Sequence, residues 1–168
     1  MKAINVHTRK IEQPKEKVAR LLRTLATEND LVWPYENWPA IRFKDGFNVG
    51  SKGGHGHIRY TVLDYKEGEY YKFQFTKPDG FVGTHELRIN AIGNNSTEIR
   101  HIIGIKLSFR ATLLWTFIIR WLHDALIEEA FDKVENYFSI DKKETAYSSW
   151  VKLLREFYKR KSLKSIHV

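Results

Sequence analysis

A long helix is predicted over residues 112–138, where hydrophobic residues recur at helical spacing and neither glycine nor proline occurs. At 1.5 Å per residue this helix is roughly 40 Å long. In its second half the apolar residues share one face, opposite a charged face. These apolar residues are Ile127, Ala130, Phe131, Val134, Tyr137 and Phe138. We expect this face to be buried against the rest of the domain.

The first half of this helix has the opposite polarity. Its inner face continues back through His123, Arg120 and Thr116. The outer face of this half is apolar and carries Leu114, Phe117, Ile118, Trp121 and Ala125. A buried charged or imidazole group is unfavourable without a partner. The polar inner face therefore predicts a ligand pocket, and the apolar outer face predicts a second element that covers it.

Residues 43–108 alternate between apolar and polar positions, which predicts five or six successive half-buried strands. Turn-rich clusters separate them, among them Gly93–Ser96. An opening strand over residues 3–12, a helix from Pro14 to about Ala26 and an irregular link precede this meander. The link carries three aromatic packing residues, Trp33, Tyr35 and Trp38. The expected fold class is α+β, with a curved antiparallel sheet wrapped around the long helix.

A basic amphipathic helix is predicted near the end of the chain. Its apolar positions are Trp150, Leu153, Leu154 and Phe157. Residues 142–168 contain eight Lys/Arg and two Glu, which is +6 of the formal net charge of +8. We expect the apolar stripe to pack on the outer face formed by Leu114, Phe117, Ile118 and Trp121. Two alternatives stay open, namely a homodimer through these stripes and contact with an anionic membrane surface. Nucleic acid is not expected as a partner, because no DNA- or RNA-binding motif accompanies the basic residues.

Composition narrows the protein class. A chain of 168 residues suits one domain with a sizeable core. The chain has no cysteine, which excludes disulfides, thiolate metal sites and cysteine nucleophiles. The start of the chain has no apolar stretch of signal-peptide length. The longest apolar run, Ala111 to Ile119, is far below the ~20 residues needed to span a bilayer. We expect a cytoplasmic protein without a cofactor.

The sequence resembles the START-like superfamily, also called SRPBCC, which includes polyketide cyclase-like proteins with the helix-grip fold. The segments that carry the resemblance are IEQPKEKVARLL, GHGHIRYTVLDYKEGEYYKFQF, GFVGTHELRI, STEIRH and LHDALIEEAFDKVE. They look most like small bacterial members without an assigned activity. The resemblance implies a START-like domain over residues 1–140, with residues 141–168 as an additional helical extension. It also implies a cavity between sheet and helix that holds a hydrophobic small molecule, and it assigns no catalytic residue.

Four nitrogen-bearing side chains are candidates to orient such a ligand. If Gly93–Ser96 closes a hairpin, His85 and His101 are near-diagonal neighbours roughly 7–8 Å apart. Arg120 and His123 reach the same space from the helix, with Arg120 as the partner for an anionic group. The expected hydrophobic enclosure consists of Tyr60, Tyr71, Phe73, Leu87 and Ile103. In the alternative interpretation each histidine is an ordinary core residue, and Arg120 pairs with Glu86 or Asp124.

Catalysis and metal binding are the remaining hypotheses. His85, His101 or His123 could act as a general base beside a carbonyl group, as in a cyclase or dehydratase. A metal site at His55, His57 and His85 is not expected, because His57 falls on the strand face opposite to Tyr60. The glycine-rich loop at Gly50–Gly56 matches no phosphate-binding motif, and no serine lies in a GxSxG elbow.

Overall fold

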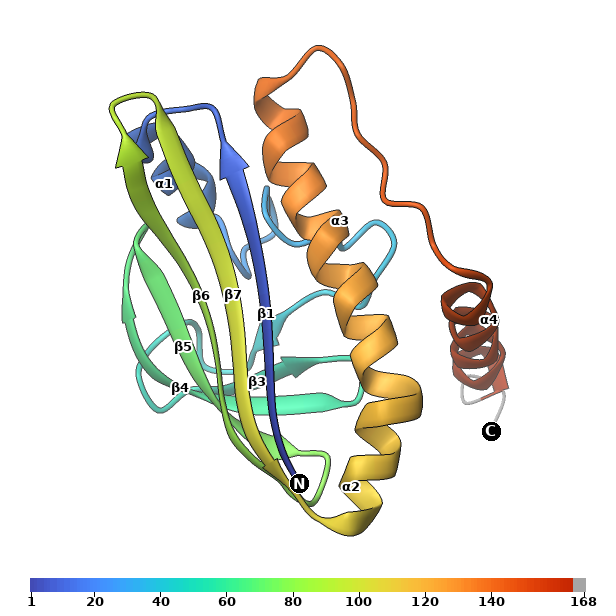
Figure 1. Cartoon of the computed structure of the whole chain (residues 1–168). Coiled ribbons are helices and arrows are strands. Elements are labelled where there is room, and N and C mark those ends of the chain that lie inside the picture. The colour runs from blue at the N-terminus through green and yellow to red at the C-terminus, as the bar shows by residue number, and fades with distance from the viewer. Residues whose placement is uncertain (165–168) are drawn as a thin grey trace.

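A computed structural model of the chain shows a curved seven-stranded antiparallel sheet with one long helix lying along it (Figure 1). The structure describes residues 1–164, with side chains as far as Tyr158. The strands are β1 (Lys2–Ile11), β2 (Arg42–Phe43), β3 (Lys52–His55), β4 (Ile58–Lys66), β5 (Tyr70–Lys77), β6 (Phe81–Gly93) and β7 (Ser96–Leu107). Their order in the sheet is β1-β7-β6-β5-β4-β3-β2. The predicted α+β class with a curved sheet around a long helix is confirmed.

The hairpin between β6 and β7 sets the register of the inner face. Gly93 pairs with Ser96, so the predicted turn closes this hairpin. His85 then pairs with Ile103, and Leu87 pairs with His101. Because side chains alternate between the two faces of a strand, His85 and His101 are diagonal neighbours on one face, as predicted. On the other side of β7, His101 pairs with His7 of the edge strand β1.

The long helix consists of three continuous segments, α2 (Phe109–Leu114), the π-helical turn η1 (Trp115–Ile119) and α3 (Arg120–Phe138). The Ser108 side chain caps its beginning by accepting a hydrogen bond from the Ala111 amide. The second half of the helix closes the main core, where Phe131 and Val134 are fully buried. The π-helical turn is a departure from the sequence expectation, which assumed one uniform helical period.

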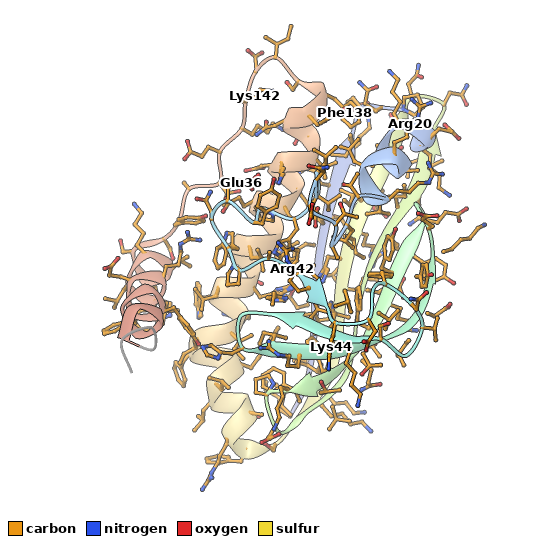
Figure 2. The ribbon with its side chains drawn as sticks, turned by 180° about the vertical axis from the view of Figure 1, so that it is seen from behind. Arg20, Glu36, Arg42, Lys44, Phe138 and Lys142 are labelled. Atoms are coloured by element: carbon orange, nitrogen blue, oxygen red, sulfur yellow. The ribbon has the colours of Figure 1, made fainter. Side chains whose placement is uncertain are left out.

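Two further helices complete the fold. Helix α1 (Lys15–Leu22) covers one end of the sheet and buries Val18 and Leu22. Helix α4 (Ser149–Lys164) follows an extended link and lies beyond the long helix, away from the sheet, as Figures 1 and 2 show. Among residues 1–164, no helix combines the length and the hydropathy needed to cross a membrane.

The tail helix forms as predicted, but its buried face differs from the expectation. Among the side chains of α4 that the structure describes, Val151 and Leu154 are buried. Leu154 belongs to the expected stripe, but Trp150, Leu153 and Phe157 of the same stripe are exposed. The expected apolar contact between α4 and Phe117 is instead a hydrogen bond. The Trp150 indole N–H donates to the Phe117 carbonyl, with an N–O distance of 2.9 Å. The sequence pattern identified an amphipathic helix, but it did not reveal that part of the apolar surface remains uncovered. Residues 165–168 of the predicted extension lie outside the described residues.

Candidate functional site

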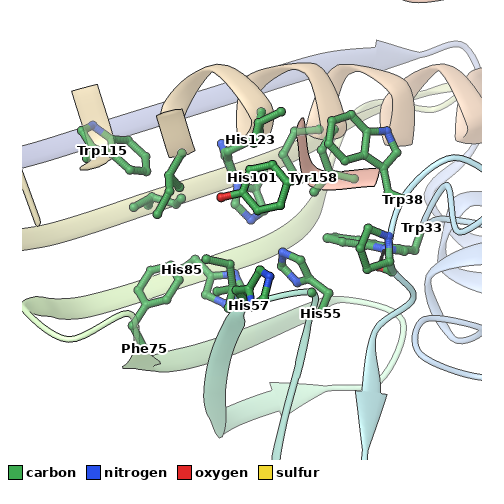
Figure 3. Close-up of a pocket in the computed structure, with 18 of the residues that line it drawn as sticks. Trp33, Trp38, His55, His57, Phe75, His85, His101, Trp115, His123 and Tyr158 are labelled. Atoms are coloured by element: carbon green, nitrogen blue, oxygen red, sulfur yellow. Dashed lines mark hydrogen bonds between the residues drawn. The ribbon is translucent and has the colours of Figure 1, made fainter. Parts of the chain in front are cut away.

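A cavity of about 650 Å³ lies between the sheet and the first half of the long helix. This volume falls in the range of small-molecule sites. Five groups of residues line the cavity: Trp33, Asn37, Trp38 and Pro39 from the link before β2; His55, Gly56, His57 and Ile58 from the β3–β4 turn; Phe75, Phe81, His85, His101 and Ile103 from the sheet; Trp115, Ile119, Leu122, His123, Leu126 and Ile127 from the long helix; and Arg155 and Tyr158 from α4. Figure 3 shows most of them around the open space. The walls are therefore mainly aromatic and aliphatic, with imidazole groups among them.

A row of imidazole and phenol rings crosses the inner surface of the sheet and ends at the helix. The His123 and His101 ring centroids are 4.9 Å apart, and the His101 and His85 centroids are 5.6 Å apart. His85 also stacks on Phe73 and Phe75, each with a centroid distance of 4.7 Å. The cavity thus presents several polar nitrogen atoms within an otherwise apolar wall.

The nitrogen atoms of this row lack protein partners. His85 Nε2, His101 Nδ1 and both ring nitrogens of His123 are buried without a hydrogen bond within the described structure. Buried polar atoms are nearly always paired, so each such atom calls for a partner. A ligand or water molecule in the cavity would supply partners for several of them at once.

The residues expected to bind the ligand divide into two groups. His85, His101, Ile103 and His123 line the cavity. Tyr60, Tyr71, Phe73 and Leu87 are buried in the main core and do not line it. Tyr60 nevertheless contacts the row, because its ring lies 4.8 Å from His85 and its hydroxyl lies 3.3 Å from His55 Nδ1. Tyr60 and Phe73 therefore lie directly behind the cavity wall, in contact with His85.

Arg120 lies outside the cavity, in contrast to the expectation from the sequence. Its guanidinium carbon lies 5.0 Å from the centroid of the Trp121 ring. The reason is the π-helical turn η1, in which the Arg120 amide donates to the Trp115 carbonyl five residues back, so that the positions up to and including Arg120 are rotated relative to the rest of α3. Trp115 and Ile119 take the inner positions that the sequence pattern assigned to Thr116 and Arg120. The structure therefore offers no buried cation of the helix as an anion partner in this cavity.

Burial keeps His55, His85, His101 and His123 neutral. Desolvation lowers the pKa of His55 to about 3, with a smaller contribution from His123. Desolvation also holds the pKa values of His85 and His101 well below the usual range. The pKa of His123 is lowered for the same reason, although the neighbouring Asp124 carboxylate opposes the shift. Near neutral pH these imidazoles can therefore donate and accept hydrogen bonds but carry no charge.

A charged network lies directly behind His123, between β1 and α3. The His7 imidazole bridges two carboxylates, with Nε2 at 3.1 Å from Asp124 Oδ1 and Nδ1 at 2.6 Å from Glu128 Oε1. Burial alone would lower the pKa of His7, but its hydrogen bonds to Asp124 and Glu128 raise it. His123 Nδ1 lies 3.5 Å from the same Asp124 oxygen. His123 thus connects the neutral cavity with a charged network at the edge of the sheet.

This network also brings together residues of the type that hold metals. His7, His123 and Asp124 each place a potential ligand atom within 4.8 Å of the others. The His7 imidazole, however, is already paired on both sides by carboxylates, and Asn5 donates to Asp124 Oδ1 at 2.9 Å. Ion pairing and hydrogen bonding account for this geometry without a metal ion.

The mouth of the cavity is built from parts that the sequence pattern did not connect. Arg155 of α4 lies over the rings of Trp38 and Tyr147, at 4.2 Å and 4.5 Å from their centroids. It also donates a hydrogen bond to the Asn37 carbonyl, with an N–O distance of 3.0 Å. Tyr158 approaches His57, with ring centroids 5.9 Å apart. Helix α4 thus closes one side of the opening.

Several lining residues left only a weak signal in the sequence. The aromatic residues of the link were recognised as packing residues, and Trp33 and Trp38 are now seen to border the cavity. His57 lies in the turn before β4, where strand alternation no longer fixes the direction of a side chain. The contribution of Arg155 and Tyr158 depends on where α4 docks, which local sequence patterns do not encode.

Comparisons with known proteins give information on the fold alone. No family model matches the sequence, and no curated protein matches it. A structural-genomics protein from Nitrosospira multiformis is 13% identical, with a TM-score of 0.62, and the alignment covers 82% of this chain and 97% of that one. A conserved protein of unknown function from Enterococcus faecalis is 10% identical, with a TM-score of 0.58, and the alignment covers 97% of this chain and 86% of that one.

An enzyme is also among the similar structures. Norcoclaurine synthase from Thalictrum flavum, in complex with dopamine and hydroxybenzaldehyde, is 10% identical with a TM-score of 0.62. The alignment covers 85% of this chain and 90% of the synthase. Together with the sheet order and the long helix, these likenesses show that this chain has a helix-grip fold.

Proposed function

We propose that this protein binds a hydrophobic or aromatic small molecule, of a lipid-like or polyketide-like kind, in the cavity between the sheet and the long helix. The observation that carries the proposal is the cavity of about 650 Å³ whose apolar walls contain buried imidazole nitrogens without partners. An apolar guest with a hydroxyl, phenol or carbonyl group suits this wall, because neutral imidazoles can donate to or accept from such a group. A cytoplasmic setting belongs to the same proposal.

One of the structurally similar proteins supports the proposal of a small organic ligand. Norcoclaurine synthase, with the same fold, is described in complex with two aromatic molecules, dopamine and hydroxybenzaldehyde. Sequence identity of 10% transfers no residue roles. The guest of this protein is therefore proposed from its own cavity walls, which are mainly aromatic and aliphatic and so favour an apolar ring or chain.

Native mass spectrometry of the purified protein tests this proposal. We expect a co-purifying mass that organic extraction releases, or saturable enhancement of anilinonaphthalene sulfonate fluorescence. The variant Ile119→Trp should fill part of the cavity and reduce probe binding, because Ile119 lines it. Ile118→Trp is the matched control, since the adjacent Ile118 does not line the cavity. Equal probe binding by both folded variants would contradict the proposal.

A second candidate function is acid–base catalysis on the bound molecule. One observation favours it: neutral His101 and His123 face the cavity, and His123 adjoins the Asp124–His7–Glu128 network. A neutral, desolvated imidazole can accept a proton from a carbon beside a carbonyl group. Asp124 would then stabilise the imidazolium that forms on His123. This arrangement is compatible with a cyclase or dehydratase.

Nitrobenzisoxazole, whose ring opens when a base removes one proton, is a suitable probe of this second function. We expect His123→Ala to reduce proton abstraction on the order of a hundredfold, the usual contribution of a general base. His57→Ala serves as the control, because His57 lies at the exposed edge of the cavity. Equal rates for His123→Ala and the parent protein would exclude His123 as the base while leaving ligand binding unaffected.

A further inference from the structure

Two stripes of exposed hydrophobic residues run along the outer side of the molecule, away from the sheet. The first lies on the long helix and contains Phe109, Leu113, Phe117 and Trp121, spaced four residues apart. The second lies on α4 and contains Trp150, Leu153 and Phe157. The two stripes meet where the Trp150 indole donates to the Phe117 carbonyl. We refer to these seven residues as the outer apolar face. A monomeric protein rarely exposes so many large apolar side chains together unless they bind something.

The segments that carry the outer apolar face also carry the excess positive charge of the protein. Residues 109–123 contain two Lys/Arg and no Asp/Glu, and residues 149–164 contain six Lys/Arg and one Glu. Their combined formal charge of +7 is nearly the whole net charge of +8, so the remaining residues sum to +1. Arg110 and Lys152 are exposed on these segments. Hydrophobic side chains and cations therefore occur in the same two segments.

We propose that the outer apolar face docks on an anionic lipid bilayer, with its aromatic and aliphatic side chains at the level of the headgroups and its cations beside the lipid phosphates. Tryptophan and phenylalanine beside lysine and arginine are typical of helices that lie in a membrane interface. The positive charge discriminates between this partner and a second copy of the chain. A symmetric dimer would bring two faces of like charge together, whereas an anionic bilayer attracts the same face.

Docking of this face would bring α4 to the bilayer. Arg155 and Tyr158 of α4 border the cavity, whereas Leu153 and Phe157 of the same helix belong to the outer apolar face. A bilayer that engages Leu153 and Phe157 would therefore act on an element that also closes the cavity mouth. The docking proposal goes beyond ligand binding, and its test does not depend on the identity of a ligand.

Flotation of the full chain with lipid vesicles tests the proposal. We expect binding to vesicles of equal parts phosphatidylcholine and phosphatidylglycerol, and little binding to phosphatidylcholine alone. Phe109→Ser should weaken binding on the order of fivefold, because it removes one inserted ring. Ile4→Ser is the matched control, since Phe109 and Ile4 are both 80% exposed and Ile4 lies on the edge strand β1.

Charge reversal gives a second, independent comparison. Lys152→Glu should weaken binding to the anionic vesicles on the order of fivefold or more, whereas Lys44→Glu should have little effect. Both lysines are exposed and both changes alter the net charge equally, but Lys44 lies outside the two cationic segments. Circular dichroism of each variant verifies that the fold is retained.

Three results would overturn the proposal. These are equal binding to neutral and anionic vesicles, equal effects of the face and control substitutions, and absence of vesicle binding by a protein that sedimentation shows to be a dimer. In the last case Phe109→Ser would dissociate the dimer, and the outer apolar face would be a subunit interface. Because probe binding in the cavity is measured without lipid, failure here is distinguishable from failure of the proposed ligand binding.

Discussion

The two halves of the long helix pack against the curved sheet in different ways. In the second half, Phe131 and Val134 are 1% and 0% exposed and complete a closed core. In the first half, Ile119 and His123 face a cavity. On the other side of this half, Phe109, Leu113, Phe117 and Trp121 are exposed. The comparison shows that one continuous helix can complete a closed core at one end and border a cavity at the other.

The sharpest test of this division is a pair of truncations. Phe131→Ala removes a fully buried ring from the closed half and should lower the free energy of unfolding by about 3–5 kcal/mol. Ile119→Ala lies in the half that already borders a cavity, so fewer contacts are lost, and a decrease of about 1 kcal/mol is expected. Urea denaturation measures both. Equal losses would show that the two halves do not differ in packing.

The charged network between β1 and α3 should matter nearly as much. Arg9 pairs with Glu128, Asp132 and Glu135, and Asp132 is buried. Arg9→Met would leave a buried carboxylate without its cation, and we expect a loss of about 2–3 kcal/mol in urea denaturation. Lys10→Met is the control, because the Lys10–Glu12 pair is exposed to solvent and should contribute little to stability. If Arg9→Met and Lys10→Met lowered the free energy of unfolding equally, the buried network would contribute no more than an exposed ion pair.

The neutral histidines of the cavity should make the protein sensitive to acid. Because burial holds the pKa of His85 well below its ordinary value, the unfolded chain binds this proton first as the pH falls through 6.5, the usual pKa of histidine. Stability is therefore present above that pH and is lost below it. The free energy of unfolding should therefore decrease between pH 7 and pH 5 because of this residue.

The variant His85→Phe isolates that contribution. Phe73 and Phe75 already stack on the ring at this position, so a phenyl group fits the local packing. His7, whose pKa is raised and whose contribution therefore has the opposite sign, is present in both proteins and cancels in the difference. Urea denaturation at the two pH values measures the effect. If the parent protein and the variant lose equal stability on acidification, His85 is not the acid-sensitive group.

The smallest expected effect concerns the mouth of the cavity. Arg155→Ala removes the contacts with Trp38 and Tyr147 and the hydrogen bond to Asn37, which should decrease stability by only about 1 kcal/mol. Dissociation of anilinonaphthalene sulfonate should become faster by a larger factor than its association, which stopped-flow fluorescence resolves. Lys152→Ala is the control on the same helix. An unchanged dissociation rate would show that Arg155 does not hold the mouth closed.

Much of the fold could be predicted from the sequence because its signals are local. Strand alternation and the turn at Gly93–Ser96 placed His85 and His101 as diagonal neighbours, and the structure has this register. The charged and apolar faces of the second helical half likewise follow from periodicity alone, and Phe131 and Val134 are buried as expected.

The candidate site was harder to predict, because it depends on a local shift of the helical period and on where separate segments pack together. Because of one π-helical turn, Ile119 and not Arg120 lies on the inner face of the helix. No residue in Trp115–Ile119 indicates such a turn in the sequence. Trp38, His57 and Tyr158 come together from three separate segments, so their meeting is a property of tertiary packing. The direction of a side chain in a loop, such as that of His57, is not fixed by any period.

The turn at Trp115–Ile119 also gives this architecture a simple way to vary. Deleting one residue there would restore an ordinary helical period and rotate every preceding side chain about the axis by roughly 100° relative to α3, while the strands stayed in place. Trp115 would leave the cavity wall and a different side chain would take its place. A change of length by a single amino acid would thus alter the shape and polarity of the cavity without altering the sheet.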